Sequence, residues 1–308
     1  MHEEAFRFGR NEYLVGVLTQ PDMPVNAPAI ILLNAGMIHH VGPSRIYVRL
    51  ARRLTLQSFV TLRFDFSGIG DSCARTDNLA IEQAVLDDVQ QAMDFLTAQT
   101  GVTRFILIGH CSGAWVSFFV ASQDPRVVGT VLMNPEGGGE DWSEYDRQRK
   151  VSRFYQQYYS REALVDPERW KKLLTGKADY RSIARNVAQN IVWNRISTAV
   201  FKVRHRLDSG GNQDTPPEQQ SLRDHIVQAF VEQRIQLLLL FSAGSSAIEH
   251  VHTMLGHEFD TIMESGVGQE IIIPNADHTF TLLSGQQTLI QHIETWCATF
   301  LTSPIPGG

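Results

Sequence analysis

The sequence has few cysteines, no long hydrophobic run and no large excess of either charge. Its three cysteines, Cys73, Cys111 and Cys297, are widely spaced and form no Cys-x-x-Cys pair, so neither a disulfide framework nor a zinc site is predicted. The longest strongly apolar stretch, Leu237 to Phe241, is far shorter than the roughly 20 residues that span a bilayer. We therefore expect no membrane span.

The charge balance argues against a polyanionic partner. The chain has 27 Lys and Arg against 33 Asp and Glu, a net charge of -6, and no long basic run. Nucleic acid is therefore not an expected partner. The first residues, Met1 to Phe6, are acidic where a secretory signal would be basic. Together with the sparse cysteines, this predicts a cytoplasmic protein.

What the sequence does contain is an alternation of apolar runs and helical patterns. Ala29 to Leu33 is fully apolar, and Ser44 to Leu56 follows with helical spacing. The same alternation continues with strands predicted at 59–64, 104–109, 127–133, 235–241 and 270–273, and helices at 80–98, from 112, at 248–263 and at 284–301. An α/β fold is predicted, with a mostly parallel sheet covered by helices on both faces.

The alternation stops between Pro135 and about Val231, where the chain becomes polar, aromatic and helix-like. We interpret this segment, 135–231, as a helical lid inserted into an α/β core formed by 1–134 and 232–308. Such a lid could gate a substrate or form the contact surface of a homodimer. The periodicity of the sequence does not distinguish between these two roles.

A candidate nucleophile lies between the strand at 104–109 and the next helix, in Gly109-His110-Cys111-Ser112-Gly113. A sharp strand-to-helix turn needs small residues two positions before and two after its central residue. Gly109 and Gly113 satisfy this only if Cys111 is central, since Ser112 would put the bulky His110 at a tight position. We expect His110 to be a packing or pocket-lining residue.

This arrangement resembles the α/β-hydrolase superfamily, in which Gly-x-Ser-x-Gly follows the central strand. The resemblance spans roughly 29–134 and 232–303, with cysteine in place of serine. Gly-x-Cys-x-Gly is similar to the motif of dienelactone hydrolases and polyhydroxyalkanoate synthases. The stretches at 42–54 and 63–72 resemble the thioesterase and serine-aminopeptidase-like branches.

A catalytic base is expected after the last strand, where the sequence reads Asp277-His278-Thr279, and the superfamily also places its histidine there. We select His278. The family's acid usually follows the strand at 235–241, but serines occupy that place, and the nearest carboxylate is Glu249. Glu249 is our first candidate and Glu136 the alternative. A Cys–His dyad without an acid is a third possibility.

The oxyanion hole is expected to use the backbone N–H of Ser112 and one from the loop after the first core strand. By resemblance Met37 supplies the second, with Ile38 as the alternative. Asp65 and Asp71 lie in a stretch that relatives use as a structural turn, so we predict no metal there. No cofactor is predicted.

These residues predict acyl chemistry in which Cys111 attacks an activated carbonyl and His278 moves the proton. We expect hydrolysis of an ester or thioester, with a small-molecule or carrier-bound acyl substrate. An acyltransferase that moves the acyl group from a carrier or coenzyme A thioester to an amine or alcohol is the alternative. A third hypothesis is a non-catalytic module that binds an acyl ligand or a partner, suggested by the serines in the usual place of the acid.

Overall fold

The computed structural model describes residues 1–23, 26–77, 79–136 and 217–302. One sheet of eight strands runs through the core. Its strands are β1 (His2–Phe8), β2 (Leu14–Gln20), β3 (Ala29–Leu33), β4 (Thr61–Asp65), β5 (Phe105–His110), β6 (Val127–Met133), β7 (Gln236–Ser242) and β8 (Gly268–Ile273). The predicted strands are therefore present, with bounds that shift by a few residues.

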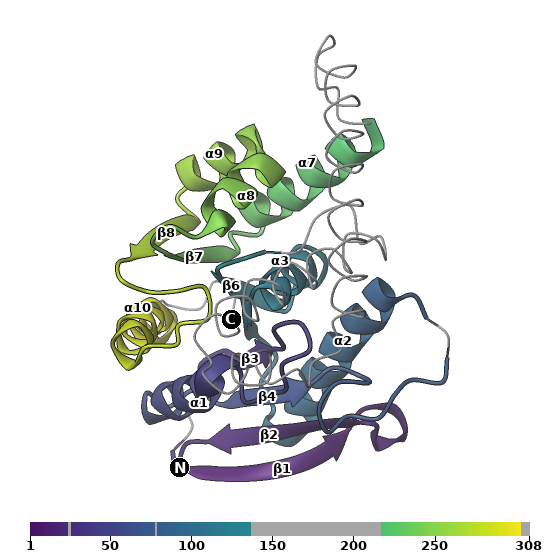
Figure 1. The fold of residues 1–308 in the computed structure, drawn as a ribbon. Coiled ribbons are helices and arrows are strands. Elements are labelled where there is room, and N and C mark those ends of the chain that lie inside the picture. Colours follow the sequence, from purple (N-terminus) through teal and green to yellow (C-terminus); the bar gives the residue numbers. More distant parts are fainter. Residues whose placement is uncertain (24–25, 78, 137–216, 303–308) are drawn as a thin grey trace, which may run out of the picture. The chain divides into compact units, whose positions relative to one another are not determined.

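The strand order is β1-β2-β4-β3-β5-β6-β7-β8 (Figure 1). The first two strands are antiparallel to their neighbours, and all pairs from β4 to β8 are parallel. In parallel strands the carboxyl ends meet at one edge, where α/β proteins place their ligand sites. The predicted nucleophile and base both follow strands at this edge.

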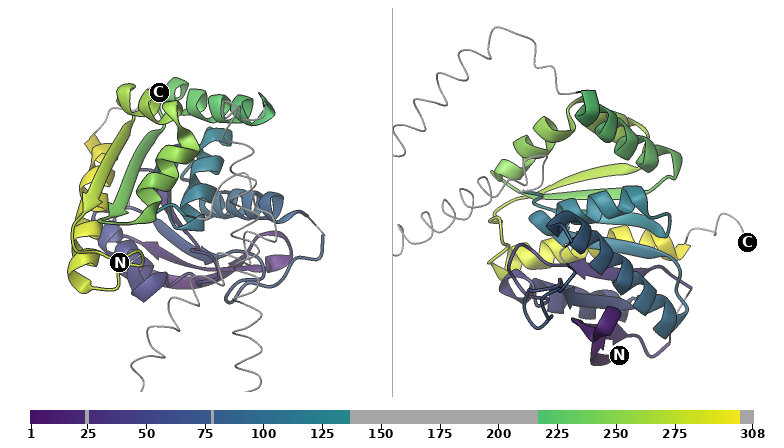
Figure 2. Two further views of the ribbon diagram at one scale, coloured as in Figure 1. Left: turned by 45° about the horizontal axis from the view of Figure 1, so that its top comes forward. Right: turned by 90° about the vertical axis from the view of Figure 1, so that its right-hand side faces the viewer.

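Helices cover both faces of the sheet, as predicted. They are α1 (Ile46–Leu56), α2 (Ile81–Thr100), α3 (Ser112–Gln123), α7 (Pro217–Glu232), α8 (Ser246–Leu255), α9 (His257–Glu264) and α10 (Leu283–Thr302), with short 3-10 turns at Arg10–Glu12 and Pro43–Arg45. Buried side chains of α1 and α10 form one hydrophobic cluster with the sheet, and those of the other five helices form a second. Figure 2 shows the yellow α10 and the green α7 on opposite sides of the sheet.

Strand β3 shows why the core sequences are apolar throughout. All five of its residues are buried. Ile31 and Leu33 enter the cluster beneath α2 and α3, whereas Ile30 and Leu32 enter the cluster beneath α1 and α10. Because successive side chains of a strand point to opposite faces, both faces of β3 must be apolar to enter the two clusters.

Two boundaries differ from the sequence prediction. The single helix expected at 248–263 is two helices, α8 and α9, because Gly256 adopts a positive φ of 56° between them. The predicted lid, 135–231, falls mostly outside the described residues. Its last part is α7, whose Ile226 and Phe230 are buried in the core cluster. No helix in the described ranges is long and apolar enough to cross a membrane.

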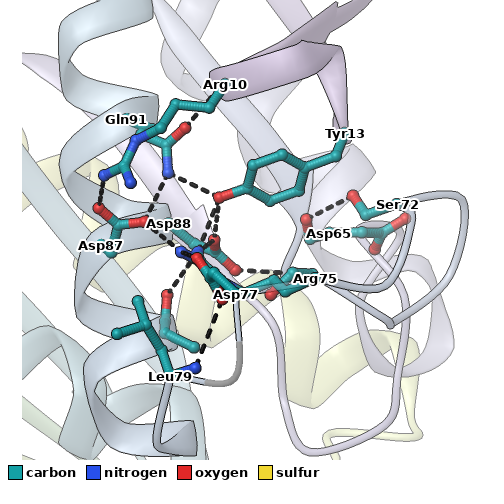
Figure 3. A network of polar contacts seen from close by, with 12 residues as sticks. Arg10, Tyr13, Asp65, Ser72, Arg75, Asp77, Leu79, Asp87, Asp88 and Gln91 are labelled. Carbon is teal, nitrogen blue, oxygen red and sulfur yellow. Dashed lines mark hydrogen bonds and ion pairs between the residues drawn. The ribbon is translucent and has the colours of Figure 1, made fainter.

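The loop after β4 is fastened by a group of paired side chains that we call the Arg75 network (Figure 3). It consists of Arg75, Tyr13, Asp87, Asp88 and Gln91. The Arg75 guanidinium contacts Asp88 and Asp87, both at 2.7 Å, and the Tyr13 hydroxyl at 2.7 Å. Gln91 donates to Tyr13 and Asp87. The network thereby ties this loop to α2 and to the start of β2.

Candidate active site

Cys111 lies at a strained turn between β5 and α3. Its backbone has φ 55° and ψ -120°, a conformation that residues other than glycine adopt only at a cost in free energy. Its N–H donates to the Met133 carbonyl at 3.0 Å, which ties the turn to the end of β6. The side chain is half-buried at the first turn of α3, where the helix dipole favours a negative charge. This is the geometry of a nucleophile elbow.

The two glycines of the motif are required by close backbone contacts. A Cβ on Gly109 would lie 2.1 Å from the Gly113 carbonyl oxygen, and a Cβ on Gly113 would lie 2.2 Å from the Asn34 carbonyl oxygen. Both obstacles are main-chain atoms, which cannot rotate away as a side chain can. The elbow therefore packs directly on its own helix and on the loop after β3.

His278 lies in the loop that follows β8, at the same edge of the sheet. Its Nδ1 is 3.6 Å from the Oε1 of Glu136, and the two side chains are 29% and 31% exposed. Its ring centroid is 4.8 Å from that of His110, the neighbour of Cys111. The Cys111 thiol in turn donates to the Glu136 carbonyl at 3.6 Å. Cys111, His278 and Glu136 are thus gathered in one place.

The carboxylate beside His278 is that of Glu136, our alternative candidate for the acid. Ser246 donates a hydrogen bond to its Oε1 at 2.7 Å, and Ser245 does so at 3.4 Å. Glu249 is exposed on α8, and no ion pair within 4.0 Å joins it to His278 in the described part of the chain. The serines in the usual place of the acid therefore bind a glutamate from the segment that follows the neighbouring strand, β6.

The loop after β3 contains the N–H group of Met37, the second predicted oxyanion donor. Gly36 donates to the Ser112 hydroxyl at 2.9 Å, and Ile38 donates to the Ala35 carbonyl at 3.0 Å. Met37 is 81% exposed, and its N–H makes no hydrogen bond within the described ranges. The Ser112 N–H lies in the first turn of α3, where helix N–H groups have no intrahelical partner. Met37 and Ser112 remain the predicted donors to an oxyanion.

Asp65 organises the same loop from beneath. It is fully buried and accepts from the His40 N–H at 2.5 Å, the His40 ring at 2.8 Å, the Asn34 amide at 3.1 Å and the Asp71 N–H at 3.0 Å. Burial opposes its ionisation, but the hydrogen bonds outweigh burial and hold the Asp65 pKa below its usual range. His40, Asp65 and Asp71 have potential ligand atoms within 4.8 Å of one another. Because both Asp65 oxygens already accept hydrogen bonds, this geometry favours a structural turn over a metal site.

Two further side chains contact the main chain of His278, and the sequence did not predict either contact. His110, expected to pack or line a pocket, donates from Nε2 to the His278 carbonyl at 2.7 Å. Asn134, which follows β6, donates to the same carbonyl at 2.8 Å. The signal for Asn134 was its position directly after a buried strand at the carboxyl edge.

The fold and the elbow together define an α/β hydrolase. Residues 26–190 match the family model described as serine aminopeptidase, S33. This match covers more than half of the chain, which therefore belongs to that family. Family members are serine enzymes by this description, so Cys111 is a departure.

Individual relatives are distant. A segment of 126 residues is 25% identical to Esterase EstD of Thermotoga maritima and covers 40% of this chain but 30% of the esterase. ATU1826 of Agrobacterium tumefaciens aligns over 99% of this chain and 100% of its own, with a TM-score of 0.55 and 14% identity. Proline iminopeptidase of Mycobacterium smegmatis aligns over 97% and 98%, with a TM-score of 0.54 and 14% identity. The structural matches confirm the α/β-hydrolase fold, and the family and esterase matches support a hydrolase enzyme.

Proposed function

We propose that the protein hydrolyses an ester or thioester through an acyl-cysteine intermediate on Cys111, with His278 as general base and Glu136 as the acid that orients it. The observation that carries the proposal is the backbone of Cys111, held at φ 55° between two glycines that other residues cannot replace. A cysteine used only for packing has no need of this strain, whereas a nucleophile presented on an elbow does.

The reaction follows from the groups at the site. His278 takes the thiol proton, and the Cys111 sulfur attacks the carbonyl carbon, whose oxygen becomes negative between the N–H groups of Met37 and Ser112. The tetrahedral intermediate collapses, the bond to the leaving group breaks, and the imidazolium returns the proton to that group. Water, deprotonated by His278, then attacks the thioester carbonyl. The carboxylic acid product is released and the Cys111 thiolate is regenerated.

Cysteine in place of serine favours one second candidate. An acyl-cysteine is a thioester, which amines attack more readily than they attack an oxoester. Acyl transfer from a carrier or coenzyme A thioester to an amine is therefore an alternative fate of the same intermediate. The two functions differ only in the group that releases the acyl chain.

The test is intact-mass spectrometry after brief incubation with acyl-pantetheine thioesters and p-nitrophenyl esters, with and without an added primary amine. We compare the wild type with Cys111→Ala, and with Cys73→Ala as a matched control, because Cys73 is an exposed cysteine far from the elbow in sequence. We expect one acyl mass on the wild type and on Cys73→Ala, and none on Cys111→Ala.

The decay of the adduct separates the candidate functions. Decay that is unchanged by amine indicates hydrolysis, and decay that accelerates with formation of amide indicates transfer. An adduct that persists on Cys111→Ala contradicts the proposal. Equal binding of acyl esters by the wild type and Cys111→Ala, without turnover by either, replaces it with a binding module.

A further inference from the structure

Two buried side chains donate hydrogen bonds to a single carbonyl oxygen, that of His278. His110 Nε2 lies 2.7 Å from it and Asn134 Nδ2 lies 2.8 Å from it. His110 is the last residue of β5, and Asn134 directly follows β6, so both donors come from the interior of the sheet. The base itself lies in a loop, and these bonds connect that loop to the rigid part of the core.

The hydrogen-bonding state of His110 is determined by its surroundings. The residue is 2% exposed, and burial, with a smaller effect of the nearby His278, lowers its pKa to about 3. The ring is therefore neutral at physiological pH. Because a carbonyl only accepts, the single ring proton must be on Nε2, which leaves Nδ1 without a hydrogen-bond partner within the described residues. A buried nitrogen left unpaired in this way is a cost that a packing residue such as phenylalanine would avoid.

Asn134 is fixed equally firmly. Its Oδ1 accepts from the Ser242 N–H at 2.8 Å, and its own N–H donates to the Leu240 carbonyl at 2.9 Å. It is fully buried and has a φ of 42°, in the left-handed region where asparagine is tolerated better than most residues. The side chain thus bridges the end of β7 and the carbonyl of His278.

The contact between His278 and its acid is comparatively weak. Nδ1 of His278 is 3.6 Å from Glu136, which is beyond hydrogen-bonding distance, and this nitrogen has no hydrogen-bond partner among the described residues. In a tightly bonded triad the acid orients the histidine ring. Here the main chain of the histidine is held more closely than its ring.

We propose that His110 and Asn134 are positioning residues that hold His278 in place for Cys111 by binding its main-chain carbonyl. We call these two hydrogen bonds the carbonyl clamp. The inference rests on the proposed function, since it assumes that His278 activates the Cys111 thiol. If one donor is lost, the loop that contains His278 can move. A displacement of about 1 Å in a catalytic group can reduce a rate about 100-fold.

The test measures the rate of Cys111 alkylation by iodoacetamide between pH 5 and 10, read by mass spectrometry on the peptide that contains Cys111. Only the thiolate reacts, so the profile reports how far His278 promotes ionisation. The ionisable groups around His278 are Glu136, His110 and the adjacent Asp277.

The following variants separate the roles, with His278→Ala as the reference that lacks the base. His110→Phe keeps a ring but removes the donor, and His110→Gln restores an amide donor. Asn134→Asp keeps the acceptor for the Ser242 N–H and loses the amide donor to His278, but it adds a carboxyl group. Asn134→Leu, which also loses the donor and adds no charge, is therefore measured beside it. Thr130→Val is the matched control, because Thr130 is equally buried on β6 and its hydroxyl donates to Ser117 rather than to His278. Thermal denaturation of each variant verifies that it is folded.

We expect His110→Phe, Asn134→Asp and Asn134→Leu to shift the profile toward that of His278→Ala and to lower the alkylation rate at pH 6.5 roughly tenfold. His110→Gln and Thr130→Val should keep the wild-type profile. Wild-type profiles for both His110→Phe and Asn134→Asp, with His278→Ala shifted, overturn the carbonyl clamp and leave the proposed function intact. Coincident profiles of the wild type and His278→Ala overturn the proposed pairing of Cys111 with His278. If His110→Phe does not fold, Asn134→Asp and Asn134→Leu together decide the clamp, and a shift in Asn134→Asp alone, which its charge explains, overturns it.

Discussion

The Arg75 network can be compared with the carboxyl edge of the sheet around Cys111, His110, His278 and Glu136, which we call the active-site edge. Both contain several polar side chains, but they differ in how fully those side chains are hydrogen-bonded. In the Arg75 network each of the five members makes at least one hydrogen bond, and Asp88, fully buried, accepts from three donors. At the active-site edge, Nδ1 of His110 and Nδ1 of His278 are buried without a hydrogen-bond partner among the described residues. The first cluster has paired its polar groups, whereas the second contains two buried ring nitrogens that are unpaired in the described part of the chain.

This difference indicates what each cluster contributes. Native proteins pair nearly all buried polar groups, and a catalytic role is one reason for leaving such a group unpaired. Gln57, Arg63 and Trp115 each also have one buried atom that is unpaired within the described ranges, so the two unpaired nitrogens support a catalytic role only together with their place beside Cys111. Changes in the Arg75 network should therefore alter the free energy of unfolding and spare activity. Changes at the active-site edge should alter activity with less effect on stability.

Gly113→Ala should break this division, because this residue of the active-site edge also supports the fold. The added Cβ would lie 2.2 Å from the Asn34 carbonyl oxygen, so the elbow and the loop after β3 must separate. We expect activity below detection and a loss of about 3 kcal/mol in the free energy of unfolding, measured by urea denaturation.

Gly285→Ala is the matched control for Gly113→Ala. It is also a helical glycine, and its added Cβ would make an ordinary contact of 3.4 Å with Ala276. We expect it to be neutral or slightly stabilising. Wild-type stability and activity in Gly113→Ala would contradict the close packing of the elbow.

Arg75→Ala should lower stability and leave catalysis alone. Removing the guanidinium leaves the buried Asp88 without its cation, and it leaves the partly buried Asp87 paired with the exposed Arg10 alone. Breaking a buried ion pair from one side typically costs about 3 kcal/mol. We expect a loss of that order in the free energy of unfolding, with kcat/KM for a p-nitrophenyl ester unchanged while the protein is folded.

The control for Arg75→Ala is Arg52→Ala, which breaks a pair with Glu3 whose arginine is 49% exposed. Exposed pairs contribute less than about 1 kcal/mol, so this variant should lose little. Equal losses in the two variants, or an altered kcat/KM in Arg75→Ala, would show that the Arg75 network is not the purely structural cluster described above.

Much of the architecture followed from the sequence because the relevant forces are local or periodic. Fully apolar runs such as Ala29–Leu33 predicted strands covered on both faces, and the two glycines around Cys111 predicted the elbow. The break between α8 and α9 was missed even though Gly256 lies in the pattern. A single glycine is tolerated within a helix, and only its backbone conformation distinguishes a break.

The partners of His278 could not be chosen from the sequence. Glu136 and Glu249 both follow strands at the carboxyl edge, and spacing along the chain favoured Glu249. Which carboxylate reaches His278 depends on the order of strands in the sheet and on the direction of each loop. The role of His110 also required the structure, because its partner lies 168 residues away.

Glu136→Gln should lower activity with little loss of stability, as expected for a residue of the active-site edge. Its carboxylate is partly exposed and lies beside the His278 ring, so its loss removes a favourable charge from an imidazolium. A Cys–His pair depends less on its acid than a Ser–His pair does, and we expect kcat/KM to fall about tenfold. Glu249→Gln, on exposed α8, is the matched control and should retain wild-type activity. The opposite ranking in steady-state assays would return the acid role to Glu249.

Tyr13→Phe should give the smallest loss of stability. The size of that loss should depend on pH, because it equals the contribution of the Tyr13 hydroxyl in the wild type. Burial, reinforced by the hydrogen bond to Asp88, raises the pKa of Tyr13 from 10.0 to about 12. Below pH 10 the phenol is neutral in both the folded and the unfolded state, so its full contribution of about 1 kcal/mol is present. Between pH 10 and pH 12 the unfolded state ionises first, and the contribution is lost as the pH rises through the folded pKa. Urea denaturation at pH 8, 10 and 11.5 should therefore show a stability gap between the wild type and Tyr13→Phe that narrows with pH. A constant gap would mean that the hydroxyl stabilises the fold without the proton that it donates to Asp88.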